Sequence, residues 1–285
     1  MNHEVIFEVI PYTKNSSAAS SEKFLGRISD FLSGLESVKL LNIPEIIEEN
    51  HLGLPYYRNA NSRKFAMAIR DRCGKEIMLN TVVVHHASSE KFQEWIDESK
   101  SCGITNFVFV GAKMESLKYP GPSIMEANSI AKSRKMNFGN IFIPEREDEA
   151  RRIIAKTKSG CNFFTSQVIF EPDLAIGVIS DYYRACKNLN LKPAKFFLSF
   201  APISTIEDIH FVKWLGANIY EVTKSRLMGA QDMGEESIKI ASEAFSKACG
   251  FFKDAKINVG IGLNVEYISL HNLELSKRLV ESLLE

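Results

Sequence analysis

Eight short runs of apolar, β-branched and aromatic residues alternate with longer amphipathic segments along this chain of 285 residues. Each run is almost continuously hydrophobic, which is typical of parallel strands buried on both faces. Eight strands that alternate with helices predict a parallel sheet, and the count of eight favours a closed barrel over a doubly wound sheet. We therefore predict an α/β fold, a single (β/α)8 TIM-type barrel domain over residues 1–285. The runs that we expect to form strands are 3–10, 38–43, 77–84, 105–110, 138–143, 162–169, 194–200 and 256–262.

The segments between these runs have helical periodicity. Residues 21–35, 90–102 and 148–159 each place apolar side chains on one face, at spacings of three and four residues. Gly103 and Gly160 stand where helices commonly end in glycine. No linker rich in Pro, Gly or Ser separates the helical stretches before the eighth run, so we predict extra helices inserted before the last strand. These stretches are 205–215, 218–228 and 235–252.

Charge and cysteine content narrow the possible partners. The chain has 35 Lys and Arg and 35 Asp and Glu, so its zero net charge gives no overall attraction to nucleic acid or anionic membranes. The five cysteines are scattered, which predicts neither a metal site nor a disulfide framework and fits the cytoplasm. The sequence shows no signal peptide and no apolar run of about 18 residues that would span a membrane. We expect a small-molecule ligand, and a homo-oligomer or protein partner stays open.

Polar residues inside the apolar runs mark the expected site, because barrel chemistry takes place at the C-terminal ends of the strands. Glu8 interrupts the first run near its end. It is either a structural glutamate paired with a basic neighbour, or an acid whose pKa is raised by apolar surroundings and which donates a proton. Gln167 interrupts the sixth run near its end. It either belongs to a core hydrogen-bond network or clamps a heterocycle through its donor and acceptor together.

Further polar positions accompany the second, third and fourth runs. Asn42 and Asn80 lie within the second and third runs, and Asn80 is either part of a polar barrel layer or a ligand contact. His85 and His86 are acid–base candidates or ordinary loop histidines. The loop 111–123 either contacts a phosphate or glutamate tail or is simply solvated. It matches neither a P-loop nor a GxGxxG signature.

Several motifs resemble the methylenetetrahydrofolate reductase family, whose members are flavin-dependent (β/α)8 barrels. FEVIPY at 7–12 is similar to the family's first-strand FEFFPP and places Glu8 on the family's catalytic glutamate. IPEREDEA at 143–150 is similar to the family's Y-P-E-x-H-P-E-A. AKTKSGCNFFTSQVIFEP at 155–172 is similar to L-K-x-K-x-x-A-G-A-[DN]-x-x-x-T-Q-x-F-[FY]-D, with Gln167 on the family's glutamine. The resemblance extends over nearly the whole chain at low identity.

The resemblance implies a reduced folate as ligand and a role for particular residues. Glu8 is implied as the general acid that helps to open the five-membered ring of 5,10-methylenetetrahydrofolate. With flavin bound, the implied oxidoreductase reaction forms 5-methyltetrahydrofolate, a step of one-carbon metabolism that serves methionine biosynthesis. The residues implied to bind the folate are Gln167, Phe170 and Asn80, and those implied to bind the cofactor are Asn42, Glu145 and Lys156.

Three departures from the family fall on its flavin side. The L-R-G-D motif after the fourth strand is FVGAKME at 109–115, the H-L-T-C motif of the third strand is TVVV at 81–84, and the histidine after the fifth strand is Glu147. The sequence therefore supports a reduced folate better than FAD. The alternative to a reductase is a flavin-free folate-binding protein, or a methyltransferase that uses 5-methyltetrahydrofolate. A Schiff-base aldolase is disfavoured, because Lys39 and Lys195 lie at strand beginnings.

Overall fold

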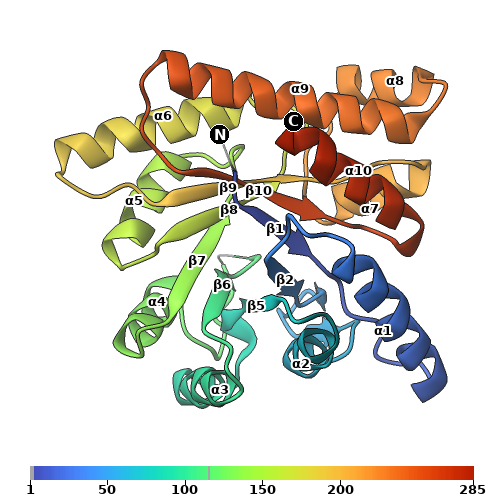
Figure 1. Cartoon of the computed structure of the whole chain (residues 1–285). Coiled ribbons are helices and arrows are strands. Elements are labelled where there is room, and N and C mark those ends of the chain that lie inside the picture. Colours follow the sequence, from blue (N-terminus) through green and yellow to red (C-terminus); the bar gives the residue numbers. More distant parts are fainter. Residues whose placement is uncertain (1–2, 115) are drawn as a thin grey trace. The chain divides into compact units, whose positions relative to one another are not determined.

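Eight parallel strands close into a barrel in the computed structural model, which describes residues 3–114 and 116–285. The strand order around the barrel is β1-β10-β9-β8-β7-β6-β5-β2 (Figure 1). The predicted fold class is confirmed. The barrel strands are β1 Val5–Glu8, β2 Leu40–Pro44, β5 Glu76–Val82, β6 Asn106–Val110, β7 Asn137–Phe142, β8 Phe163–Val168, β9 Lys195–Phe200 and β10 Ile261–Glu266.

Helices follow the strands, and three of them precede the last strand as the sequence predicted. Gly103 and Gly160 adopt φ angles of 76° and 104°, which is the left-handed conformation expected where a helix ends. Two short 3-10 helices are η1 Val83–His85 and η2 Leu270–Asn272. The α-helices are α1 Ala18–Ser33, α2 Ser62–Cys73, α3 Ser89–Ser101, α4 Ile124–Ser133, α5 Glu149–Lys158, α6 Asp173–Asn188, α7 Ile206–Trp214, α8 Glu221–Gly229, α9 Met233–Asp254 and α10 Leu273–Leu284.

The last strand lies further along the chain than predicted. We expected it at 256–262, but β10 spans Ile261–Glu266. The chain leaves α9 through a left-handed residue, Lys256 with φ 52°, and the Ile257 amide still donates to the Phe252 carbonyl at 2.8 Å. The apolar residues Ile257 and Val259 therefore belong to the helix exit, and the strand includes polar residues that the expected run excluded.

A small antiparallel hairpin follows β2 and was not predicted from the sequence. Its strands are β3 Ile47–Glu49 and β4 Pro55–Tyr57. The Asn50 side chain accepts hydrogen bonds from two backbone amides of the turn, and Gly53 supplies a φ of 75° there. Strands of three residues are too short to give a recognisable alternation.

Internal contacts divide the chain into two compact units. Unit 1 comprises residues up to Phe7, Ile141–Lys158 and Phe163–Glu285, and unit 2 comprises Glu8–Asn140 and Ser159–Asn162. In unit 2, the rings of Phe107, Phe109 and Phe138 stack in sequence at 5.8 to 5.9 Å between centroids. In unit 1, one buried cluster joins the end of β8 to the helices before β10. It contains Val168, Phe170, Ala201, Ile203, Ile209, Val212, Ala217, Ile219, Leu227, Ile240 and Ile268.

Candidate functional site

Glu8 is the last residue of β1 and belongs to unit 2, where it meets Asn42 of β2. The Asn42 side-chain amide donates a hydrogen bond of 2.7 Å to Glu8 Oε2, and both residues are buried. The Asn42 Oδ1 atom has no hydrogen-bond partner among the described residues. Two residues that the sequence assigned to separate roles, acid and cofactor contact, therefore form one buried pair.

A second carboxyl of unit 2, Glu45, follows β2 directly and was not singled out from the sequence. Its Oε2 atom accepts hydrogen bonds from Thr81 Oγ1 at 2.7 Å and from the Val82 amide at 3.0 Å. Burial raises the pKa of Glu45, against the effect of these donors. Asn80 is half-buried, and its carbonyl accepts the Glu45 amide at 3.0 Å. Glu45 thus joins the ends of β2 and β5, and the acidic residue after Pro44 was the available sequence signal.

The contacts of His85 and His86 within unit 2 indicate structural roles for both histidines. His85 Nε2 lies 2.9 Å from Glu49 Oε1, and the Tyr119 hydroxyl donates to Glu49 Oε2 at 2.9 Å. These contacts connect the hairpin strand β3 to the loops after β5 and β6. The His86 ring lies 5.0 and 5.4 Å from the Phe92 and Trp95 rings, and burial lowers its pKa to about 4. His86 is therefore neutral at physiological pH and poorly suited to carry a proton.

In unit 1, Gln167 lies near the end of β8, where the sequence placed it. The pairing of β8 with β9 is irregular between Thr165 and Val168, so that Ser166 and Gln167 stand against a single residue of β9. Gln167 Nε2 donates to the Leu215 carbonyl at 3.1 Å, and the residue is half-buried. One amide hydrogen is thus used internally, while Oε1 accepts no hydrogen bond from a described residue.

A buried hydrogen-bond network links the ends of β8, β9 and β10. The Ser199 amide donates to Ser166 Oγ at 2.8 Å, and Ser199 Oγ donates to the Ser166 carbonyl at 2.8 Å. Asn264 Nδ2 then donates to Ser199 Oγ at 2.9 Å and to Glu266 Oε1 at 3.1 Å. Sequence analysis missed Glu266 because the expected last strand ended before it.

Glu266 is the titratable carboxyl of this network. Burial raises its pKa to about 7, against the opposing effect of hydrogen bonds with Ser199 and Asn264. The residue is half-buried and ends β10. A carboxyl at a strand end that titrates near pH 7 can accept ligand donors or transfer a proton.

The remaining predicted site residues lie elsewhere in unit 1. Phe170 is 7% exposed and belongs to the core cluster described above. Glu145 is exposed in the loop after β7. Lys156 Nζ donates to the Ile141 carbonyl at 2.8 Å, so this lysine holds α5 against β7. The buried acid of this segment is Glu149, which accepts the Ile143 amide at 3.1 Å and whose pKa is raised by burial.

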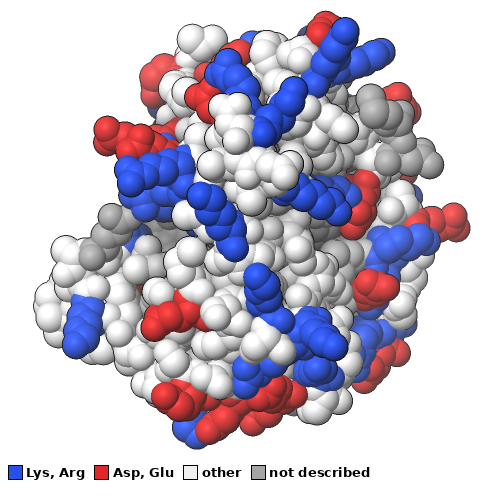
Figure 2. All heavy atoms as spheres, turned by 90° about the vertical axis from the view of Figure 1, so that its left-hand side faces the viewer, with Lys and Arg blue, Asp and Glu red and all other residues white. Residues whose placement is uncertain are grey.

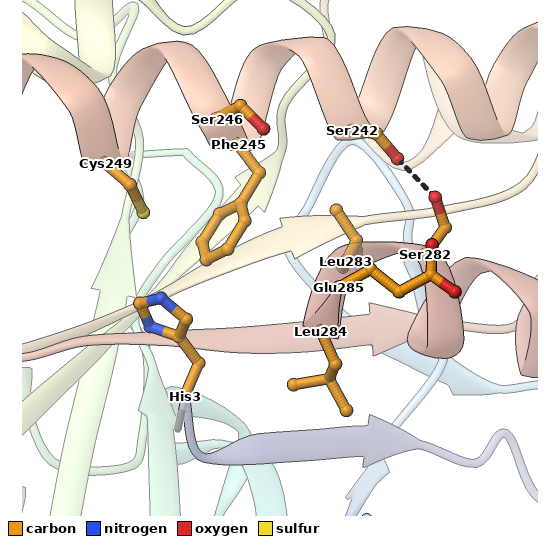
Figure 3. Close-up of a pocket in the computed structure, with 9 residues that line it drawn as sticks. All are labelled: His3, Ser242, Phe245, Ser246, Cys249, Ser282, Leu283, Leu284 and Glu285. Carbon is orange, nitrogen blue, oxygen red and sulfur yellow. Dashed lines mark hydrogen bonds between the residues drawn. The ribbon is translucent and has the colours of Figure 1, made fainter. Parts of the chain in front are cut away.

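A cavity of about 190 Å³ lies in unit 1, and Figure 3 draws the residues that line it. His3 precedes β1 and bonds the Ile261 carbonyl at 3.0 Å, so the cavity lies at the beginning of β1 and β10. Burial raises the pKa of the Cys249 thiol to about 11, which keeps it protonated at neutral pH. Because barrel chemistry takes place at strand C-terminal ends, this cavity is not the candidate site. It is lined by His3, Ser242, Phe245, Ser246, Cys249, Ser282, Leu283, Leu284 and Glu285.

The described residues show neither a surface of one charge in the view of Figure 2 nor a cluster of metal ligands. On the face drawn in Figure 2, Lys and Arg side chains are interspersed with Asp and Glu, and neither sign covers the face. Within residues 3–114 and 116–285, no three His, Cys, Asp or Glu side chains are grouped so as to hold a metal ion. None of the helices in this described part is both long and apolar enough to cross a membrane.

The closed barrel with polar side chains at its strand ends defines a (β/α)8 barrel protein. Comparisons with known proteins show which other proteins have a similar structure. No family model matches the chain, and no curated protein matches it in sequence. Its structure is similar to that of an uncharacterized protein from Clostridium thermocellum that binds two copies of 5-methyl-5,6,7,8-tetrahydrofolic acid. The TM-score is 0.81 at 21% sequence identity, over 99% of this chain and 95% of that one.

Two further solved structures share the barrel fold at lower similarity. One is orotidine 5'-phosphate decarboxylase from Pyrococcus horikoshii OT3, with a TM-score of 0.51, 8% identity, and coverage of 99% of both chains. The other is a GH113 β-1,4-mannanase, with a TM-score of 0.56, 8% identity, and coverage of 99% of this chain and 98% of that one. Their different chemistries show that this fold alone does not determine a reaction.

Proposed function

We propose that the protein binds a reduced folate, with 5-methyltetrahydrofolate as the first ligand to test. The observation that carries the proposal is the likeness, over 99% of the chain, to the Clostridium thermocellum protein that binds this compound. The strand-end residues support it. Within unit 1, Gln167 keeps an acceptor atom without a donor among the described residues at the end of β8, and Glu266 is a carboxyl at the end of β10. A heterocycle with adjacent donors and acceptors needs such groups.

The contacts of the residues that the resemblance assigns to flavin support a flavin-free function. Asn42 is occupied with Glu8, Lys156 donates to a backbone carbonyl, and Glu145 is exposed on its loop. We therefore derive no hydride transfer. Of the two functions that the sequence left open, we propose the flavin-free one, a folate-binding protein or a methyltransferase that uses 5-methyltetrahydrofolate. Reduction of 5,10-methylenetetrahydrofolate would require a bound flavin in addition to the folate.

Calorimetry with 5-methyltetrahydrofolate tests the proposal directly. We expect saturable binding by the wild-type protein, and Gln167→Ala should weaken it about tenfold or more, because an unpaired polar group in a buried site costs about 1–3 kcal/mol. Gln93→Ala is a control, since Gln93 lies on α3 and contacts Arg134. Absence of binding by the wild type would end the proposal. Binding that Gln167→Ala leaves unchanged would remove Gln167 from the site.

A further inference from the structure

Asn264 has an unusual hydrogen-bond balance. Both hydrogens of its side-chain amide are used, one toward Ser199 Oγ and one toward Glu266 Oε1. The single hydroxyl hydrogen of Ser199 goes to the Ser166 carbonyl or to the Glu266 carboxyl, so Ser199 Oγ accepts from Asn264, and this fixes the amide orientation. The Oδ1 atom is then left without a hydrogen-bond partner among the described residues, although Asn264 is only 1% exposed. Buried carbonyl oxygens are normally paired, so this atom points to a donor that comes from outside the chain.

Glu266 presents acceptor atoms beside this oxygen. Its Oε1 atom is held by Asn264, and no described residue other than Ser199 and Asn264 forms a hydrogen bond with the carboxyl. The carboxyl and Asn264 stand on one strand, two residues apart, and Asn264 pairs in register with Ser199 of β9. Groups supported on strands hold their geometry better than groups on loops. The end of β10 therefore carries a fixed set of acceptors, in which Asn264 Oδ1 has no donor among the described residues and the Glu266 carboxyl has hydrogen bonds with Ser199 and Asn264 alone.

We propose that Glu266 and Asn264 bind the donor edge of a reduced pterin ring. In this arrangement the Glu266 carboxylate accepts the N3–H and one hydrogen of the 2-amino group, and Asn264 Oδ1 accepts a further N–H of the same ring. Paired N–H groups and a carboxylate form the short, bidentate hydrogen bonds that give strong recognition. The inference rests on the proposed function, and it identifies the pterin ring as the part of the folate that unit 1 binds.

The network also explains how the acceptors stay in place. Ser166 and Ser199 form two hydrogen bonds of 2.8 Å with each other. The Ser199 hydroxyl, held in this way, accepts a hydrogen bond from the Asn264 side-chain amide. Ser166 directly precedes Gln167, and the Ser166 hydroxyl donates a hydrogen bond of 2.7 Å to the backbone carbonyl oxygen of Gln167. The same β8 irregularity therefore positions Gln167 and supports the Asn264–Glu266 pair. We infer that Asn264 is both a ligand contact and a positioning residue for Glu266.

Affinity measurements with two ligands test which part of the folate Glu266 contacts. The ligands are 5-methyltetrahydrofolate and 6-methyltetrahydropterin, which keeps the reduced pterin but lacks the aminobenzoyl-glutamate tail, both under anaerobic conditions. Glu266→Gln should weaken both by the same factor, about 10- to 100-fold, because the lost contact lies in the shared ring. The matched control is Glu274→Gln, an exposed glutamate of α10, which should bind both ligands as the wild type does.

Each outcome bears on a different statement. If the wild type binds neither ligand, the proposed function fails and this inference falls with it. If the wild type binds 5-methyltetrahydrofolate and Glu266→Gln binds it equally well, the inference is overturned while the proposed function stands. A loss for 5-methyltetrahydrofolate without a matching loss for 6-methyltetrahydropterin also overturns it. If Glu266→Gln does not fold, as judged by near-UV circular dichroism, Glu266→Asp takes its place, and wild-type affinity in that variant overturns the inference.

Discussion

Glu8 and Glu266 are kept in place at their strand ends by the same device. In each case a neighbouring buried asparagine donates its side-chain amide to the carboxyl, Asn42 to Glu8 at 2.7 Å and Asn264 to Glu266 at 3.1 Å. In each case the asparagine Oδ1 atom has no partner in the described part of the chain. Removing a carboxyl from water is costly unless donors replace the water. The asparagine amide therefore offsets part of the cost of burying each carboxyl.

The pH dependence of the free energy of unfolding tests the raised pKa of Glu266 in the absence of any ligand. Burial raises the folded-state pKa of Glu266 from 4.5 to about 7, so the folded protein holds this proton more tightly than the unfolded chain does. The resulting contribution to stability is complete below about pH 4.5 and is lost as the pH rises through 7. Glu266→Gln carries no such titration. Relative to wild type, this variant should gain about 1–3 kcal/mol in unfolding free energy between pH 5 and pH 8.

Urea denaturation of both proteins at pH 5, 6, 7 and 8 would measure this gain. The comparison cancels the contributions of the titrating groups that do not interact with Glu266. Glu274→Gln, in which an exposed glutamate is changed, should show a difference from wild type that does not vary over this range. A pH-independent difference for Glu266→Gln would mean that the carboxyl is ionised normally in the folded protein.

Among the elements, the β3–β4 hairpin is held to unit 2 chiefly by polar contacts of Glu49. Its outer residues Leu52, Leu54 and Tyr56 are 55 to 63% exposed, so little apolar burial fixes it. Glu49 instead contacts His85 and Tyr119, each at 2.9 Å. Tyr119→Phe removes one of these hydrogen bonds at a cost of about 0.5–1.5 kcal/mol. We expect amide hydrogens of residues 47–57 to exchange about 2- to 10-fold faster in this variant.

Hydrogen exchange followed by mass spectrometry of peptides from this segment gives the measurement. Tyr56→Phe is the matched control, because it removes the same hydroxyl from an exposed tyrosine of the same hairpin. It should exchange like the wild type. If Tyr119→Phe also exchanged like the wild type, the contact between Tyr119 and Glu49 would not hold the hairpin.

The elements also show what the sequence was able to predict. The buried strands were predictable because both of their faces are apolar. Two helix ends were predictable from Gly103 and Gly160, which adopt positive φ in the structure. The last strand was misplaced because the apolar residues Ile257 and Val259 lie in a helix exit rather than in a strand. That error removed Glu266 from view. The pairing of Glu8 with Asn42, 34 residues apart, depends on strand neighbours that a single sequence does not specify.

For the whole molecule, ligand binding should appear as a change in global stability. Two barrel strands contain residues of both compact units, since β1 ends with Glu8 and β7 runs from Asn137 to Phe142. A strand is not expected to unfold in halves, so we expect one thermal transition rather than two. A ligand that binds only the folded chain then stabilises the entire transition.

Thermal unfolding with and without ligands distinguishes a folate protein from a flavin protein. At a concentration 100 times its Kd, 5-methyltetrahydrofolate should add about 2.7 kcal/mol of stability, which raises Tm by roughly 4–5 °C for a chain of this size. FAD at the same concentration should leave Tm unchanged, because Asn42 and Lys156 are engaged within the protein. Folic acid, which lacks the reduced ring, reports how far binding depends on the tetrahydropterin. A protein that purifies with stoichiometric flavin, or whose Tm rises with FAD alone, would contradict the flavin-free function and favour the reductase.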